Sequence, residues 1–468
     1  MNNKKVSHNE TSKILIMGAR SVNNPAYNYS VNRLVALNPH TLQPLMAVWK
    51  YDNESMATEA DSFRDLHPSQ PLTVSAAGYD TVTLNTSNIV GNAMALAIRM
   101  IDGRVIVCGD ISSGGAQPAD IDNYDFTELA SAGHAFAAQR SNGSIFAWGD
   151  TMDGGKLPSS IASRQDIIDI AGAGASFALL ASAPPYIQCW GNNNLGAIDV
   201  PNNISSMPTL RTLVTANNAF AVLNDAGQMF AWGEGQYGGL IPDAISDLSD
   251  VVSITAATEA FAALRANGQV VAWGNSVNGG ALPESIAALD DIKQICGTYR
   301  AFCALRENGQ VVAWGSESRG GTIPAEIASL TTIVDIQANN SAFAALCADG
   351  SVVAWGNPDY ATQVPEGLTD VVALTGNCYC FAALKKEGSV TAWGNTAYGG
   401  DTASVAALLT DVRAIYSSQS VFIALKEDDT LVVWGDPASG GSMAMLPEEV
   451  QGNVSYYLYP SYLELQGC

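Results

Sequence analysis

The chain has 468 residues, of which 47% are hydrophobic and 14% charged, and its formal net charge at pH 7 is −23. This composition, with 43 glycines, is typical of a well-buried protein rich in turns and excludes a disordered one. Because a surface this acidic repels a phosphate backbone, we expect no nucleic-acid partner.

The first apolar run of the chain is ILIM, at residues 14–17. A secretory signal needs an apolar stretch of roughly 7–15 residues, and a membrane-spanning helix needs about 18–20. We therefore expect a soluble protein without a membrane span, located in the cytoplasm or exported without a cleavable signal peptide. Residues 1–71 match the repeat described next poorly. We assign them to an N-terminal β-rich elaboration, and residues 72–468 to the repeat domain.

One pattern then recurs at a nearly constant spacing, 41 residues from Trp273 to Trp314. Each copy ends in Trp-Gly, and a degenerate copy ends in Cys108-Gly109. A period of this length, with short strands and glycine turns, is typical of β-propellers. The tryptophans of the full copies are Trp148, Trp190, Trp232, Trp273, Trp314, Trp355, Trp393 and Trp434.

The copy that begins at residue 251 predicts three strands joined by short turns. VVSITAA (251–257) is apolar and rich in β-branched residues, AFAAL (260–264) is apolar with small residues, and VVAWG (270–274) completes the set. Asn267-Gly268, between the last two, is a hairpin turn that needs positive φ. We count nine such units and predict three-stranded antiparallel blades, with the recurring Phe and Trp packed between them.

The two ends of the chain suggest a way to close the ring. Residues 453–466 have the pattern of the first two strands of a unit without the third, and residues 14–25 resemble a third strand with its following loop. Pairing of these ends would complete the last blade and remove the exposed strand edges. The sequence thus predicts an all-β propeller of nine or more units, closed by its N- and C-terminal strands.

The segment AGHAFAAQRSNGSIFAWGDTMDGG (132–155) and the repeated VVAWG resemble the RCC1 repeat family of β-propellers. Only His134 keeps the histidine of that repeat, and Gly-Gly, as in Gly279-Gly280, replaces its closing Gly-Gln-Leu-Gly. The short unit is most similar to the compact, three-stranded-blade branch that includes the bacterial β-lactamase inhibitory protein II. The resemblance implies a bacterial protein, but this fold hosts inhibitors, exchange factors and effectors, so it is a weak guide to function.

The order of the strands predicts where the variable residues gather. If the first strand of a unit runs up, the loop after it and the loop after Trp-Gly both lie at the top, and the Asn-Gly turns lie at the bottom. Tyr and Arg, which are favoured at protein-binding hot spots, recur in these top loops. Some of these tyrosines could instead only cap the ends of blades. The candidate protein-binding residues are Tyr237, Asn278, Tyr299, Arg300, Arg319, Tyr360, Tyr379 and Tyr398.

The sequence carries no recognisable catalytic or metal-binding motif. None of the four histidines has a ligand spacing such as H-E-x-x-H, and His134 stands at a repeat position typical of a structural imidazole. Most of the eight cysteines lie in apolar runs, which is typical of reduced, buried thiols. We therefore expect no cofactor, no metal and no catalytic residues.

These observations favour a non-catalytic propeller that binds another protein through its loop-rich face. An inhibitor, an adaptor and a secreted effector or toxin component are all compatible with this description. The alternative is a propeller enzyme or a glycan-binding lectin with its site in the mouth of the ring.

Overall fold

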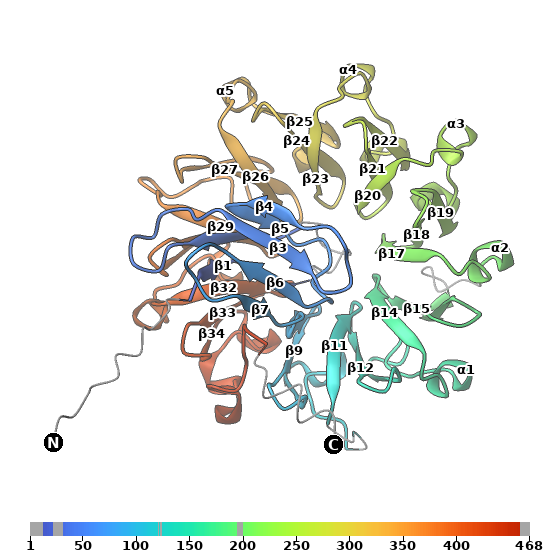
Figure 1. Ribbon diagram of the computed structural model, residues 1–468, viewed down its shortest axis with the longest axis horizontal. Coiled ribbons are helices and arrows are strands. Elements are labelled where there is room, and N and C mark those ends of the chain that lie inside the picture. The colour runs from blue at the N-terminus through green and yellow to red at the C-terminus, as the bar shows by residue number, and fades with distance from the viewer. Residues whose placement is uncertain (1–12, 22–30, 120, 122–123, 194–199, 459–468) are drawn as a thin grey trace.

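The computed structural model describes residues 13–21, 31–119, 121, 124–193 and 200–458. In these residues, nine three-stranded antiparallel sheets follow one another along the chain and form a ring of blades (Figure 1). The prediction of three-stranded antiparallel blades is therefore confirmed. From inner to outer strand, the blades are β8 (Ile89–Gly91), β9 (Ala95–Arg99) and β10 (Val105–Gly109); β11 (Phe126–Ser131), β12 (Ala135–Arg140) and β13 (Ile145–Gly149); β14 (Ile167–Gly172), β15 (Ser176–Ala181) and β16 (Ile187–Gly191); β17 (Leu210–Thr215), β18 (Ala219–Asn224) and β19 (Met229–Gly233); β20 (Val251–Ala256), β21 (Ala260–Arg265) and β22 (Val270–Gly274); β23 (Ile292–Gly297), β24 (Ala301–Arg306) and β25 (Val311–Gly315); β26 (Ile333–Ala338), β27 (Ala342–Cys347) and β28 (Val352–Gly356); β29 (Val371–Gly376), β30 (Cys380–Lys385) and β31 (Val390–Gly394); and β32 (Val412–Ser417), β33 (Val421–Lys426) and β34 (Leu431–Gly435).

Short helices lie at the outer edge of the ring, between consecutive blades (Figure 1). None of the helices in the described part of the chain is long and apolar enough to cross a membrane. The α-helices are α1 (Ser159–Ala162), α2 (Asn202–Ser205), α3 (Asp243–Ser246), α4 (Glu284–Ala287) and α5 (Ala325–Ala328).

The repeated Phe and Trp tie each blade to its neighbour. In the blade of β20–β22, Phe261 is the register partner of Trp273, and their rings stack 5.2 Å apart. The indole N–H of Trp273 donates to the carbonyl of Gly238, in the loop after the preceding blade, at 2.9 Å. The repeated Trp thus supplies an inter-blade hydrogen bond as well as buried area in every full copy of the repeat except that of Trp232, whose indole N–H has no carbonyl partner among the described residues. The same bond runs from Trp148, Trp190, Trp314, Trp355, Trp393 and Trp434 to Gly114, Gly154, Gly279, Gly320, Ala361 and Gly399.

The hairpin glycine of a blade is held by both its conformation and its neighbours. Gly268 has a φ of +80°, and a Cβ added there would lie 2.1 Å from the carbonyl oxygen of Asp290. Gly367 has a φ of +74° but nothing within 4 Å. Gly367→Ala should therefore lower the free energy of unfolding by about 1–2 kcal/mol for the left-handed conformation alone, and Gly268→Ala by clearly more. Urea denaturation of both variants measures the difference, and equal losses would contradict the role of the close contact.

Two further sheets lie at the centre of the ring, and we call the described residues of 13–84 the plug. Figure 1 shows the sheet of β3 and β6, in blue, in front of the ring's centre. A ring of nine blades has a wider centre than the usual roughly 4–8, so the inner strands cannot fill it with their own side chains. One sheet has the order β1 (Leu15–Met17), β2 (Arg33–Leu37), β5 (Ser62–Arg64), and the other β4 (Thr58–Ala60), β3 (Ala47–Tyr51), β6 (Leu72–Ser75), β7 (Val82–Leu84).

The plug packs unevenly against the ring. One apolar cluster joins its Trp49 and Leu72 to Leu96 of the first blade and Leu425 of the last. Elsewhere polar bonds reach the inner strands, as where Arg33 Nη1 donates to the carbonyl of Val372 at 3.0 Å. Although β6 and β7 follow residue 71, they pair with β3 and with each other, so the first blade begins at Ile89. The division at residue 71 stays a prediction about folding units.

The ring closes directly between its first and last blades. Inner strand β32 contacts β8, just as β8 contacts β11 and β11 contacts β14. The amide of Gln419 donates to the carbonyl of Asn92 at 3.4 Å across this junction. The same link joins consecutive blades elsewhere, as from Tyr299 to Asn340 at 2.9 Å.

Closure by the terminal strands, as predicted, is therefore wrong in its detail. Strand β1 pairs with β2 in the plug, and Tyr457 forms a bridge with Leu84. The ILIM segment has no Trp-Gly, so it lacks the side chain by which an outer strand bonds to the neighbouring loop. Residues 22–25 and 459–466 of the two predicted segments lie outside the described residues. The ends still meet, since the hydroxyl of Tyr456 donates to the carbonyl of Gly18 at 2.7 Å.

Candidate functional site

The two kinds of variable loop lie together, as the strand order predicts. Asn339, in the loop between β26 and β27, donates its side-chain N–H to the carbonyl of Tyr360, in the loop after β28, at 2.8 Å. Asn377 does the same to Tyr398 at 2.7 Å. We call the end of the ring that carries these loops the loop face. The opposite end, the turn face, carries the hairpin turns.

The plug lies on the turn side of the ring. Its Met17 and Leu42 line a small cavity together with Gly388, in the hairpin turn between β30 and β31. Figure 1 therefore views the molecule from the turn face, with the plug in front. The plug and the candidate binding residues thus belong to opposite ends of the ring.

In most of the described loops that follow an outer strand, a left-handed glycine stands directly after the variable residue; after Tyr360 this position is held by Ala361, with a φ of 64°. In the loop after β22, Asn278 precedes Gly279, which has a φ of +104°. A Cβ at Gly279 would lie 2.6 Å from a ring carbon of Phe302, in the next blade. Glycine is needed there because the loop is pressed against that ring. The residue before it is consequently held at one place on the loop face.

Six of the candidate residues form one continuous row, which we call the rim strip. The guanidinium of Arg300 lies 5.2 Å from the ring centre of Tyr299, and that of Arg319 lies 5.7 Å from the same ring. Arg319 is also 5.8 Å from the ring of Tyr360. The rim strip consists of Tyr299, Arg300, Arg319, Tyr360, Tyr379 and Tyr398.

The far end of the rim strip is a stack of three tyrosines. The rings of Tyr360 and Tyr379 stack 5.9 Å apart, and those of Tyr379 and Tyr398 stack 4.3 Å apart. All three side chains are half-buried. Burial raises the pKa of Tyr379, so its phenol stays neutral at physiological pH. The stack therefore offers ring edges and hydroxyl groups at fixed places.

The near end of the rim strip is anchored by a carboxylate that was not among the candidates. Glu259 is 9% exposed and accepts from Arg300 at 3.1 Å and from the side chains of Asn275 and Asn278 at 2.8 and 2.6 Å. The candidate Asn278 is itself 7% exposed and is buried against Glu259. Glu259 stands 41 residues before Arg300 in the repeat, and this shared slot is the signal that could have identified it.

Tyr237 does not join the other candidates. Its ring is half-buried and packs against an apolar cluster of the neighbouring blades that includes Val214, Ile254 and Trp273. It therefore caps a blade, which is the structural alternative considered for these tyrosines.

His134 and Asp153 form an ion pair elsewhere on the loop face, with 2.8 Å between Nδ1 and Oδ2. The hydrogen bond to Asp153 raises the pKa of His134 above its usual 6.5. Since the folded-state pKa is the higher one, the stabilisation by this pair is complete below the unfolded pKa and is lost as the pH rises through the folded one. NMR titration should show a raised pKa that falls in Asp153→Asn and falls less in Asp150→Asn. An unchanged pKa in Asp153→Asn would contradict this assignment.

Six of the seven cysteines in the described part of the chain are buried thiols, and Cys189 is partly buried. Burial raises the pKa of Cys108 to about 11 and that of Cys380 to about 12. Both therefore stay protonated at physiological pH, and protonated thiols are poor metal ligands. Within the described ranges, no group of three His, Cys, Asp or Glu side chains is placed to hold a metal ion.

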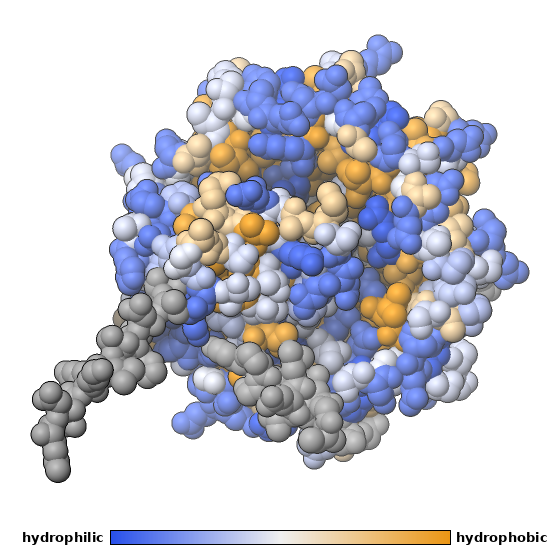
Figure 2. Space-filling view, viewed as in Figure 1, coloured by the Kyte–Doolittle hydropathy of each residue, from blue (hydrophilic) through white to orange (hydrophobic). Residues whose placement is uncertain are grey.

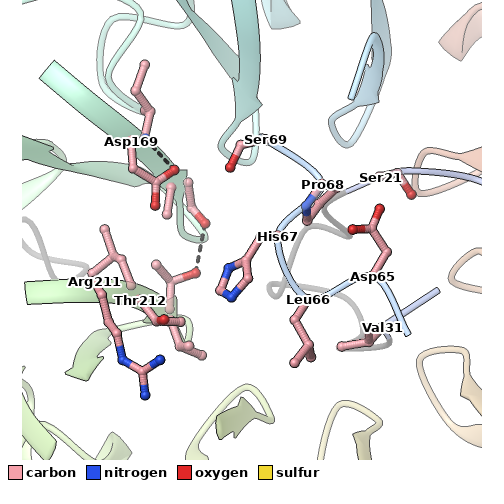
Figure 3. Close-up of a pocket in the computed structure, with 16 residues that line it drawn as sticks. Ser21, Val31, Asp65, Leu66, His67, Pro68, Ser69, Asp169, Arg211 and Thr212 are labelled. Carbon is pink, nitrogen blue, oxygen red and sulfur yellow. Dashed lines mark hydrogen bonds between the residues drawn. The ribbon is translucent and has the colours of Figure 1, made fainter. Parts of the chain in front are cut away.

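A cavity of about 110 Å³ lies at the centre of the ring, between the plug and the inner strands β14 and β17 (Figure 3). His67 of the plug and Asp169 of β14 approach it from different walls (Figure 3). Asp169 is hydrogen-bonded to Glu128 of β11, and burial raises the pKa of both carboxyl groups. This cavity is the space that a site in the mouth of the ring would use.

Figure 2 shows the surface of the turn face, viewed as in Figure 1. Apolar side chains (orange) lie beside the plug within a mainly hydrophilic surface.

Comparison with known families matches residues 292–320 to the model of the Regulator of chromosome condensation (RCC1) repeat. These residues cover β23, β24 and β25 with the loop that follows, which is one of the nine repeated units. The chain is thus a propeller of RCC1-like repeats. Its resemblance to the branch with β-lactamase inhibitory protein II stays a prediction. A comparison with curated protein sequences gives no significant match.

Several solved structures are similar to parts of the chain. The ectodomain of the receptor kinase CR4 from Physcomitrella patens is 18% identical, with a TM-score of 0.38 over 58% of this chain and 74% of that one. Prp20p from Saccharomyces cerevisiae, studied for its binding to Gsp1p and histones, is 15% identical, with a TM-score of 0.38 over 68% and 83%. Yeast RCC1 (Prp20), in its complex with Kap60, is 15% identical, with a TM-score of 0.36 over 84% of this chain and 86% of that one. These scores are too low to carry an argument about function.

Proposed function

We propose that this propeller of RCC1-like repeats is a non-catalytic protein that binds another protein through the rim strip. The observation that supports the proposal is the continuity of the strip, in which six Tyr and Arg side chains from three consecutive blades are in contact. Tyr and Arg carry much of the binding energy at protein interfaces. Because stacking already fixes these side chains, little conformational entropy is lost when a partner binds.

Exposed apolar side chains on the same face support an extended interface. Ile111 is 76% exposed, Met152 63% and Val277 72%, and each lies in a loop that follows an outer strand. Of these three, Val277 lies nearest the strip, because its neighbour Asn278 donates to Glu259, the partner of Arg300. The net charge of −23 supports a protein over a nucleic acid as that partner.

The finer assignment rests on the resemblance to the compact bacterial branch of the family. It favours an inhibitor, an adaptor or a secreted effector or toxin component, acting in the cytoplasm or after export without a cleavable signal peptide. In each of these roles the propeller is a rigid scaffold and the loop residues determine the partner.

The rival function is an enzyme or lectin that uses the central cavity lined by His67 and Asp169. The two functions are distinguished by offering the full chain to a lysate of its native cells and, in parallel, to a glycan array. We expect one stoichiometric protein to be retained by the wild type and lost with Tyr379→Ala/Tyr398→Ala. Tyr124→Ala, which removes a 64% exposed tyrosine outside the strip, should keep it. Glycan binding that depends on Asp169 and not on the tyrosines would favour the rival.

A further inference from the structure

We infer that the rim strip recognises a protein segment that presents one carboxylate to Arg319, next to a proline or an aromatic ring that packs on the tyrosine stack. This inference rests on the proposed function and names the chemistry of the partner. Four features of the strip support it: the hydrogen bonds of Arg319, the pairing of Arg300, the exposed acids beside them, and the hydroxyls of the tyrosines.

Arg319 is a guanidinium held ready for an anion. It lies between the rings of Tyr299 and Tyr360, and its Nη1 donates to Asn340 Oδ1 at 3.2 Å and to the hydroxyl of Ser341. Its Nε and Nη2 donate to no residue among those described. These two donors form the fork that binds the two oxygens of a carboxylate.

The other arginine of the strip is already neutralised. Arg300 lies 3.1 Å from Glu259, a nearly buried carboxylate. Arg319, by contrast, has no carboxylate oxygen within 4.0 Å in the described part of the chain. A guanidinium fixed between two rings, without its own counter-ion, is therefore left to be paired by the partner.

Two exposed acids limit which anions can use this site. Glu317 is in the same short turn as Arg319, and Asp359 precedes Tyr360. Both are exposed, so they stay hydrated and repel a second negative charge placed near the guanidinium. The strongly acidic molecule as a whole disfavours a polyacidic segment in the same way. The strip consequently selects a single carboxylate within an otherwise neutral or basic segment.

The tyrosine stack supplies the rest of the recognition. The hydroxyl groups of Tyr360, Tyr379 and Tyr398 make no hydrogen bond to any described residue, while their rings are half-buried and stacked. Such rings bind flat apolar groups and leave their hydroxyls for the backbone of an extended segment. A proline or an aromatic residue next to the acid would pack on the tyrosine stack while the acid pairs with Arg319.

The test is selection of a displayed library of random 12-residue peptides on the full chain. We expect enriched peptides with one Asp or Glu next to Pro, Phe, Tyr or Trp. Changing that acid to its amide, or making Arg319→Gln, should weaken binding at least about 30-fold, and combining the two should add little. Arg265→Gln, which removes an arginine paired with Asp250 at the turn face, is the matched control and should bind normally.

Enriched peptides without an acid, equal binding to Arg319→Gln, or no enrichment would each overturn the inference. So would binding of acidic glycans in place of peptides. The proposed function can fail separately, because it depends on retention of a native protein by Tyr379 and Tyr398. If Arg319→Gln retains such a protein with unchanged affinity, the proposed protein binding stands and only the inferred recognition of a carboxylate is overturned.

Discussion

Asp65→Asn is expected to lower the free energy of unfolding by about 3–5 kcal/mol, because it removes one partner of a buried ion pair. Asp65 is 3% exposed and accepts from Arg20 Nε at 2.8 Å and from the hydroxyl of Tyr51, also at 2.8 Å. Arg20 is 1% exposed and cannot reach water when its counter-ion is lost. The uncompensated buried cation carries most of the cost.

This pair joins separate parts of the plug. Arg20 follows the β1 strand, Asp65 follows β5, and Arg20 also donates to the carbonyls of Gln70 and Asn85 at 2.7 and 2.8 Å. Asp65→Asn should therefore loosen the plug first. Limited proteolysis, together with urea unfolding followed by tryptophan fluorescence, measures local and global losses separately.

Two controls make the result specific to burial. Asp102→Asn breaks the exposed pair of Arg104 and Asp102, which are 38% and 46% exposed, and should cost at most about 1 kcal/mol. Arg20→Met/Asp65→Leu removes both charges and should recover part of the loss. If Asp65→Asn costs no more than Asp102→Asn, the ion pair does not hold the plug.

The blades could be predicted because the residues that repeat in the sequence are the same residues that make the contacts within and between blades. Trp273 appears in the sequence as part of a period, and in the fold the same residue stacks on Phe261 and bonds to Gly238. The common face of the variable loops followed from strand order alone. The way in which the ring closes could not be predicted from strand order, because it depends on the curvature between blades. That curvature sets whether β32 reaches β8.

The candidate site was predictable in its location and not in its contacts. Tyr360, Tyr379 and Tyr398 are 19 residues apart in sequence, and only the packing of two neighbouring blades brings them into a stack. Tyr237 occupies the same slot as Arg319 and Tyr398. Tyr237 and Tyr398 both pack against apolar clusters, but Tyr398 also stacks on Tyr379, whereas no ring or guanidinium among the described residues contacts Tyr237. The slot therefore predicts a place on the loop face, whereas the neighbouring blade decides whether a strip forms.

The largest effect on binding is expected for Arg319→Ala/Tyr379→Ala/Tyr398→Ala. Truncation of a hot-spot residue costs about 2 kcal/mol or more, so the triple variant should bind the retained partner at least about 1,000-fold more weakly. The free energy of unfolding should fall much less than the free energy of binding, because all three side chains are only half-buried, although Tyr379 and Tyr398 pack against the cluster that includes Phe422 and Trp434. Isothermal titration calorimetry with the retained protein, beside urea denaturation of each variant, measures both quantities.

The tyrosine stack also predicts how the losses of binding free energy caused by two of these substitutions combine. Tyr379 and Tyr398 touch at 4.3 Å, so truncating one leaves the other without its support. In a double-mutant cycle their losses should be non-additive by about 0.5–3 kcal/mol. Tyr237→Ala, on the same face but outside the strip, should weaken binding less than threefold and be additive with both. If Tyr237→Ala costs as much as Tyr398→Ala, the loop face as a whole binds the partner, and the rim strip is not its centre.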